Sequence, residues 1–132
     1  MNFEKLTIKA QQAVQQAVDR AMSLEQQAVT PVHLLAGVLQ VGENVTQFIF
    51  GKLGVNEHVL QTAIDNELKH QPRVSGGQPY LSTESDRVMV QAEKTATANG
   101  DTYVGLEPLL MALLEVKSVA SDSYTHLRAH ET

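Results

Sequence analysis

The chain has 132 residues and contains neither cysteine nor tryptophan. Its formal net charge is −5 at pH 7. The lack of cysteine excludes disulfides, thiolate metal sites and a cysteine nucleophile. The acidic balance gives no electrostatic reason to expect nucleic acid or an anionic membrane as a partner. No apolar run approaches the roughly 18 residues of a membrane span, and the first residues carry no signal-peptide pattern. We therefore expect a small cytoplasmic protein.

The first half of the chain predicts four helices. Apolar residues recur at steps of three and four between residues 7 and 24, and Thr7 is the expected N-cap. A second helix begins at Thr30-Pro31 and ends at Gly42, a third covers 44–53, and a fourth follows Asn56. The residues expected to face the core are Ala10, Ala13, Val14, Ala17, Val18, Ala21, Leu24, Leu34, Leu35, Val38, Leu39, Phe48, Ile49, Leu53, Val59, Leu60, Ile64 and Leu68.

The second half predicts two more helices after a loop rich in Gly and Pro at 71–80. The first is capped by Ser82 or Thr83 and ends at Asn99-Gly100, and the second covers 106–116. No strand-like alternation of useful length is present. The residues expected to face inward are Val88, Met89, Ala92, Ala96, Leu109, Leu110, Leu113 and Leu114.

The two halves align without a gap at an offset of 75 residues, at which Leu6 meets Leu81 and Val29 meets Val104. Helix starts, the connection between helices and the paired leucines all match in this register, as expected for a duplicated unit. The sequence therefore predicts an all-α fold, a pseudo-two-fold duplicated helical bundle. We assign 1–70 to the first repeat, 71–80 to a linker and 81–122 to an incomplete second repeat whose apolar face is partly uncovered. Residues 123–132 do not continue the pattern, and we interpret them as a cloning-derived tail outside the fold.

The sequence contains no catalytic constellation. The phosphate-binding loop, the dinucleotide-binding fingerprint and the helical zinc motif are all absent. His33 is expected to be a partly buried histidine whose ring is satisfied by a backbone carbonyl. We therefore predict no catalytic residue, no cofactor and no metal for this chain, which is expected to bind rather than to catalyse.

Three segments together resemble the Clp N-terminal domain, a helical double-repeat module at the front of Clp ATPases. They are Phe3–Ala17, the Thr30–Leu35 segment and the junction Gly100–Glu107, and the last of these is most similar to the ClpB type. The resemblance implies two Clp repeats of four helices, of which the second is truncated here.

The resemblance also implies a function. Such a domain binds unfolded or aggregated polypeptide and passes it to its own ATPase ring, a homohexamer in the full-length protein. ATP and magnesium would belong to the absent ATPase domains, and a co-chaperone of the DnaK type is a further implied partner. One alternative is an adaptor-binding N-domain of a ClpA/ClpC-type unfoldase coupled to a protease. Another is a free-standing helical scaffold.

The resemblance places substrate contacts on Thr7, Asp101 and Glu107. Tyr103 lies between the two acids and is a candidate aromatic anchor. Simpler interpretations remain open, since Thr7 is also an expected N-cap, the acids suit the positive end of the helix that begins near Leu106, and Tyr103 suits a core.

The resemblance is weaker at the positions where the family lines its groove with larger apolar side chains. Gln91, Thr95 and Pro108 occupy those positions here. We therefore expect a shallower and more polar groove than in the family.

Overall fold

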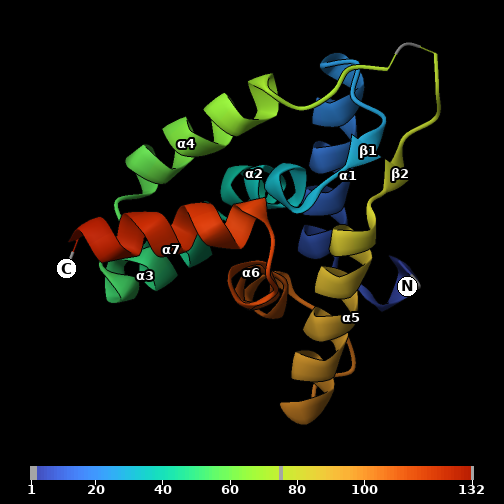
Figure 1. The fold of residues 1–132 in the computed structure, drawn as a ribbon. Helices are drawn as coiled ribbons and strands as arrows, with labels where there is room; N and C mark the ends of the chain where they lie inside the picture. Colours follow the sequence, from blue (N-terminus) through green and yellow to red (C-terminus); the bar gives the residue numbers. More distant parts are fainter. Residues whose placement is uncertain (1–2, 75, 132) are drawn as a thin grey trace.

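The computed structural model describes residues 3–74 and 76–131, with side chains through residue 128. Its regular elements are helices and two strands of two residues each, joined by loops (Figure 1). None of the described helices combines the length and apolarity that a membrane-spanning segment requires. The elements in chain order are η1 (Phe3–Lys5), α1 (Ile8–Ser23), β1 (Ala28–Val29), α2 (Pro31–Val41), α3 (Glu43–Leu53), α4 (Glu57–Lys69), β2 (Tyr80–Leu81), α5 (Thr83–Ala98), α6 (Leu106–Glu115) and α7 (Val119–Glu131).

Helices α2 and α6 form the centre of the molecule. Every residue of α2 from Pro31 to Leu39 is buried, and so is most of α6. A helix that is apolar on all sides must be surrounded by other elements. In Figure 1, α6 is seen end-on between α5 and α7, while α1 and α4 flank α2. The buried residues of both halves join in one core.

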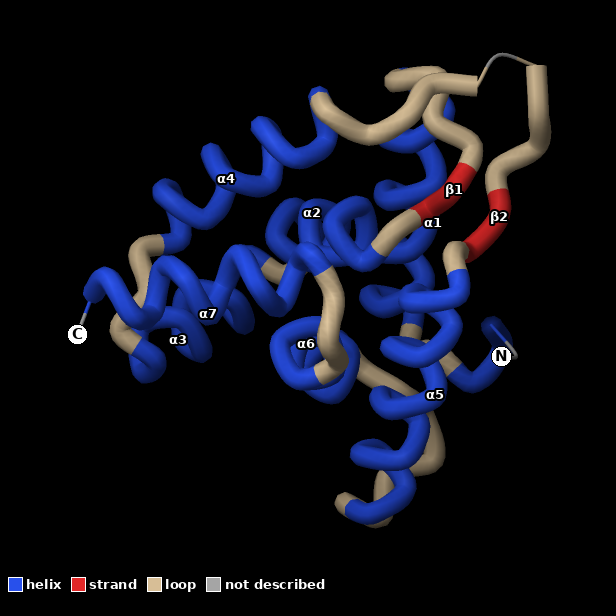
Figure 2. The backbone as a smooth tube through the Cα atoms, in the orientation of Figure 1, coloured by secondary structure: helices blue, strands red, loops and turns tan. Residues whose placement is uncertain are grey.

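Two short parallel backbone pairings link the halves. Leu6 pairs with Val104, and Val29 pairs with Leu81, the second pairing being the β1–β2 contact of Figure 2. The offset of 75 residues converts one pairing into the other. It also relates two hydrogen bonds of 3.0 Å, from the Thr7 N–H to the Val104 carbonyl and from the Ser82 N–H to the Val29 carbonyl. The predicted duplicated fold is therefore confirmed.

One packing difference separates the two repeats. Gly37 of α2 lies so close to α1 that a Cβ atom there would overlap the Ala13 carbonyl oxygen. The equivalent residue of α6 is Ala112, which is fully buried. The second repeat thus accommodates a methyl group at the position where the first repeat has glycine. The α1–α2 contact therefore depends on a missing side chain, whereas the α5–α6 contact does not.

Two inward-facing predictions in α3 and α4 are wrong. Phe48 is 63% exposed and Val59 is 42% exposed, whereas Phe50 is buried. Residues two apart lie on opposite sides of a helix, so burying Phe50 turns Phe48 outward. The Lys52 ammonium lies 4.8 Å from the centre of the exposed Phe48 ring.

The prediction of only two helices in the second half is also wrong. Helix α7 follows α6 in the position that α3 holds after α2. Tyr124 is buried, and its ring centre lies 6.4 Å from that of Phe50. The interpretation that residues 123–132 are a tail outside the fold is therefore wrong, because Tyr124 lies in the core and Leu127 of α7 packs against it, while their cloning origin stays a prediction. Within the predicted linker and tail, Ser75, Thr132 and the side chains of 129–131 lie outside the described residues.

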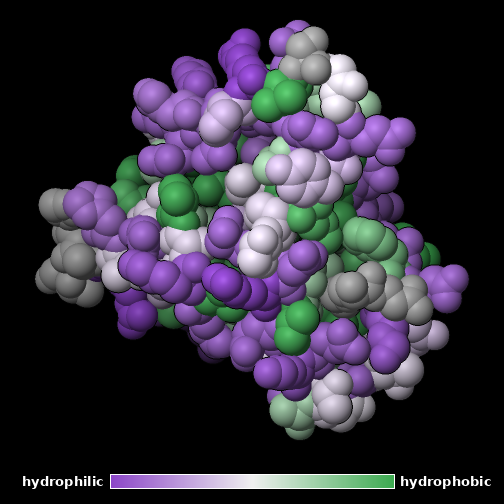
Figure 3. Space-filling model, turned by 45° about the vertical axis from the view of Figure 1, so that its right-hand side comes forward, coloured by the Kyte–Doolittle hydropathy of each residue, from purple (hydrophilic) through white to green (hydrophobic). Residues whose placement is uncertain are grey.

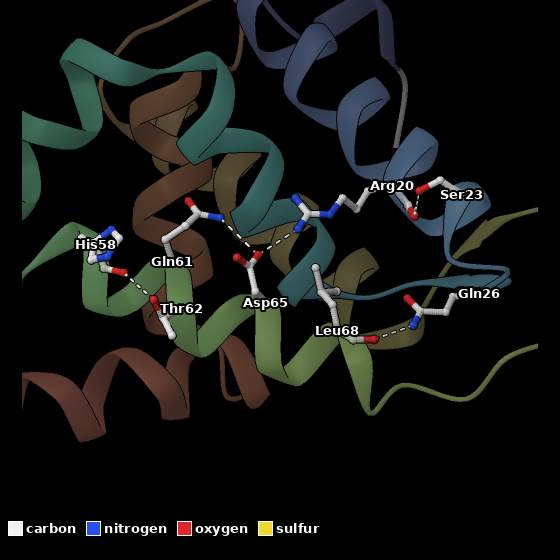
Figure 4. Close-up of polar contacts among 8 residues, drawn as sticks. All are labelled: Arg20, Ser23, Gln26, His58, Gln61, Thr62, Asp65 and Leu68. Atoms are coloured by element: carbon white, nitrogen blue, oxygen red, sulfur yellow. Dashed lines mark hydrogen bonds and ion pairs between the residues drawn. The ribbon is translucent and has the colours of Figure 1, made fainter.

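Two polar contacts tie α4 to the first helical pair (Figure 4). The Arg20 guanidinium of α1 donates to the Asp65 carboxylate of α4 at 2.8 Å. Gln26, which is buried in the turn after α1, donates to the Leu68 carbonyl at the end of α4. Non-local polar contacts of this kind fix the angle of a helix that buries only one narrow stripe.

His33 occupies the centre of this polar network. The Thr30 N–H donates to Nδ1 at 3.0 Å, and Nε2 lies 2.7 Å from the Gln26 Oε1. Because Nδ1 accepts a hydrogen bond, the proton of the neutral ring is on Nε2. Burial, and secondly the Arg20 charge, lower the pKa of His33 from 6.5 to about 4. The ring is thus fully buried and bonded to a backbone N–H and a side chain, not to the backbone carbonyl we expected.

The Gly37 contact predicts opposite effects for two Gly→Ala changes. Gly37→Ala should lower the free energy of unfolding by about 3 kcal/mol, because the new methyl group meets backbone that cannot move aside. Gly51→Ala in α3 is the control, since nothing lies within 4 Å of its added Cβ. That change should raise the free energy of unfolding by about 0.5–1 kcal/mol. Urea unfolding of both variants measures the difference, and equal effects would contradict the packing argument.

The His33 network predicts a loss of stability in acid. The unfolded chain takes up a proton on this ring near pH 6.5, whereas the folded chain does so only near pH 4. Protonation therefore favours unfolding between these values, and stability should fall by about 3 kcal/mol from pH 7 to pH 4 through this ring. Urea unfolding of His33→Gln should show a smaller pH dependence. The exposed His58→Gln variant should match the unmodified protein, and a His33→Gln profile unchanged from it would contradict the assignment.

Candidate functional site

The predicted site residues gather where the N-terminal segment pairs with the connection between α5 and α6. The Val104 N–H donates to the Lys5 carbonyl at 2.8 Å, beside the Leu6–Val104 pairing. Side chains alternate along paired segments. Leu6 and Val104 therefore enter the core, while their neighbours in the chain face outward. We call this surface, made of residues 3–8 and 101–107, the junction surface.

Thr7 is the N-cap of α1, as predicted. Its hydroxyl accepts a hydrogen bond from the Ala10 N–H at 3.2 Å. Its methyl carbon lies against Gly105, the N-cap residue of α6. Thr7 is half-buried, so part of its surface remains open at the centre of the junction surface.

Asp101 and Glu107 lie at either end of the connection and are both exposed. Glu107 lies in the first turn of α6, where the helix dipole favours an acid. Asp101 instead follows the C-terminus of α5, where its N–H donates to the Ala96 carbonyl and where an acid gains nothing from that dipole. Among the described residues, neither carboxylate has a hydrogen-bond or ion-pair partner.

Tyr103 is 56% exposed, so the interpretation as a core residue is wrong. Two more large apolar side chains of the junction surface are exposed, Phe3 at 47% and Ile8 at 74%. Sequence reasoning missed both of these. Ile8 could have been found, because it falls outside the apolar stripe of α1.

The three predicted groove positions do not form one apolar cavity. Gln91 and Thr95 are half-buried on α5, and Pro108 is buried in α6. Gln91 lines a shallow hollow of about 450 Å³ together with Val90, Lys94, Val116 and three residues of the first turns of α5. Figure 3, which brings the N-terminal side forward, shows separate green patches among purple residues rather than a continuous apolar groove.

The junction surface combines exposed acids with exposed apolar side chains. The Thr7 hydroxyl is hydrogen-bonded as a cap and has no histidine or carboxylate partner among the described residues. In the same part of the chain, no group of three or more His, Asp or Glu residues could hold a metal ion. The junction surface carries Asp101 and Glu107, whose carboxylates have no partner among the described residues, and the exposed side chains of Phe3, Ile8 and Tyr103.

Comparison with known proteins gives a consistent match over most of the chain. The family model for the Clp repeat (R) N-terminal domain matches residues 5–127. A relative named Chaperone protein ClpB from Bacteroides thetaiotaomicron is 50% identical over 121 residues, which are 92% of this chain and 14% of that protein. A protein of the same name from Porphyromonas gingivalis is 44% identical over the same shares. The chain thus spans about a seventh of the length of these relatives.

Solved structures match the fold. The N-terminal domain of Hsp104 from Candida albicans superposes with a TM-score of 0.77 at 21% identity, over 93% of this chain and 81% of that one. The N-terminal domain of the ClpV1 ATPase from E. coli superposes with a TM-score of 0.80 at 20% identity, over 98% and 82%. At such identities the likeness concerns the fold alone.

The capping role of Thr7 predicts a specific stability effect. Thr7→Val removes the hydroxyl that accepts from the Ala10 N–H and should lower the free energy of unfolding by about 1 kcal/mol. Thr7→Ser keeps the hydroxyl and should leave the free energy of unfolding unchanged. Thr97→Val, on the exposed face of α5, is the matched control and should change stability little. Urea unfolding checks all three. A destabilised Thr7→Ser variant would show that the methyl group, not the hydroxyl, stabilises this end of α1.

Proposed function

Because the chain belongs to the Clp N-terminal repeat family, we propose that it binds unfolded or aggregated polypeptide through the junction surface. It would serve as the N-terminal substrate-binding domain of a ClpB-type chaperone. The family match over residues 5–127 and the ClpB relatives support this proposal.

The remaining functions belong to parts of such a protein beyond this chain. In the proposal, bound polypeptide passes to a hexameric ATPase ring of the same protein, which uses ATP and magnesium in the cytoplasm. A co-chaperone of the DnaK type would cooperate with that ring. The N-terminal domain itself would hold the client and would make or break no bond.

The observation that carries the proposal is the unpaired acidic pair Asp101 and Glu107. Two exposed carboxylates, Asp101 in the connection and Glu107 in the first turn of α6, favour a client segment that contains Lys or Arg. Tyr103 between them has a large apolar ring with a polar tip, which suits contact with many side chains. A surface of this composition does not require a folded partner of fixed shape.

The polar groove positions suggest weak binding. Gln91 and Thr95 provide no large apolar surface, and Pro108 is buried. We expect dissociation constants on the order of micromolar or weaker. Weak capture suits a domain that has to release its client to a downstream ring.

The acidic pair predicts which variant loses client binding. Replacing both Asp101 and Glu107 by Ala should weaken binding of a fluorescent, unstructured peptide rich in Lys and aromatic residues by about tenfold, measured by anisotropy. A matched peptide with Gln in place of each Lys should bind the unmodified protein more weakly. The double Ala change should reduce the binding of this peptide less than that of the Lys peptide.

The control is a double Ala variant of Glu84 and Glu115, which are also exposed acids of the second repeat. It carries the same charge change away from the junction surface, so binding should remain close to that of the unmodified protein. Equal losses in both double variants would reject the assigned site. Binding to a folded adaptor with none to the peptide would favour the alternative, an adaptor-binding N-domain of the ClpA/ClpC type.

A further inference from the structure

The Gln11 side chain is one of the groups that hold the N-terminal turn η1, together with the backbone pairing at Lys5 and the Lys5–Glu93 ion pair. The Gln11 amide of α1 donates hydrogen bonds to the Phe3 carbonyl at 3.3 Å and to the Leu6 carbonyl at 3.1 Å. The Leu6 N–H donates to the same Phe3 carbonyl at 3.1 Å. A carbonyl oxygen has two lone pairs and can accept both bonds. Gln11 therefore joins both ends of η1 to the first turns of α1.

The second repeat differs from the first both at the position of this amide and at Pro79 in the segment equivalent to η1. The residue equivalent to Gln11 is Asp86, whose carboxylate accepts hydrogen bonds but cannot donate to carbonyl oxygens. The segment equivalent to η1 begins at Gln78 and contains no 3-10 turn, and it continues in the extended strand β2. A turn is thus present in the repeat that has the donor and absent in the repeat that lacks it.

The turn affects where Phe3 lies relative to the rest of the junction surface. It places Phe3 before the Leu6–Val104 pairing, while Ile8 follows Thr7 and Tyr103 lies in the paired segment. Phe3, Ile8 and Tyr103 remain largely exposed and contribute little to the core. In the second repeat, Gln78 and Thr83 occupy the places of Phe3 and Ile8, so the second junction lacks these two apolar side chains.

We propose that Gln11 is a positioning residue that holds η1 as one wall of the client site, so that Phe3 and Ile8, with Tyr103, contact an apolar client side chain. This inference rests on the proposed function. It adds an apolar subsite of the junction surface to the acidic pair. Gln11 does not touch the client in this proposal, but acts by positioning Phe3.

The neighbouring glutamine provides a matched control. Gln12 is exposed in the same turn of α1 and makes no side-chain hydrogen bond among the described residues. Gln11→Glu keeps the size of the side chain and removes its donors, while Gln12→Glu makes the same charge change without affecting η1. Gln11→Lys and Gln12→Lys form a second pair in which position 11 retains a donor.

The test measures peptide binding by anisotropy with the same aromatic, Lys-containing peptide. Gln11→Glu should weaken binding about fivefold, Gln12→Glu should leave it unchanged, and Gln11→Lys should bind better than Gln11→Glu. Phe3→Ala should weaken binding to a similar degree. Adding Gln11→Glu to Phe3→Ala should cause little further loss, because both changes remove the same wall. Helix content and urea unfolding should stay unchanged in all variants.

The outcomes separate this inference from the proposed function. If the double Asp101 and Glu107 variant weakens binding but Gln11→Glu matches Gln12→Glu, the inference is wrong and the proposed function stands. Fully additive losses from Gln11→Glu and Phe3→Ala would also overturn it, because Gln11 would then not act through Phe3. If the unmodified protein binds no peptide, both proposals fail.

Discussion

The two parallel backbone pairings are the constraint on which the rest of the structure depends. Leu6–Val104 and Val29–Leu81 each join the start of one repeat to the interhelical connection of the other. They fix the N-termini of α1 and α5, and thereby the angles at which these helices meet α2 and α6. The junction surface is a product of the first pairing, which brings Thr7 beside the segment that carries the acids and Tyr103.

The two junctions have equivalent backbone pairings but different side chains. Asp101 and Glu107 are exposed at one junction, whereas the equivalent residues of the other, Gln26 and Val32, are buried. Gln26 instead joins His33 to the end of α4. At the second junction these two positions belong to the core, whereas the first junction exposes an acid at each of them. Duplication supplied two similar sites, and substitution at a few positions made them unequal.

Sequence reasoning reached those features that depend on local spacing. The caps Thr7 and Ser82, the stop at Gly54 and the offset of 75 residues are all visible as short patterns, and the structure confirms them. Phe48 and Phe50 could not be separated in the same way, because α3 is short and carries apolar residues on several sides. The partners of His33 lie in other elements and leave no local pattern. Helix α7 was missed because residues 123–132 were interpreted as a tail, although Ala120, Tyr124 and Leu127 recur at helical spacing.

The crossed arrangement of the pairings has a consequence for how such a fold arises. Each half supplies the extended segment with which the other half pairs, so the N–H groups of Thr7, Tyr80, Ser82 and Val104 each donate to a carbonyl of the other half. A polypeptide consisting of one repeat could complete the arrangement only by exchanging this segment with a second copy. That exchange would give a symmetric homodimer whose backbone pairings match those between the two repeats of this chain.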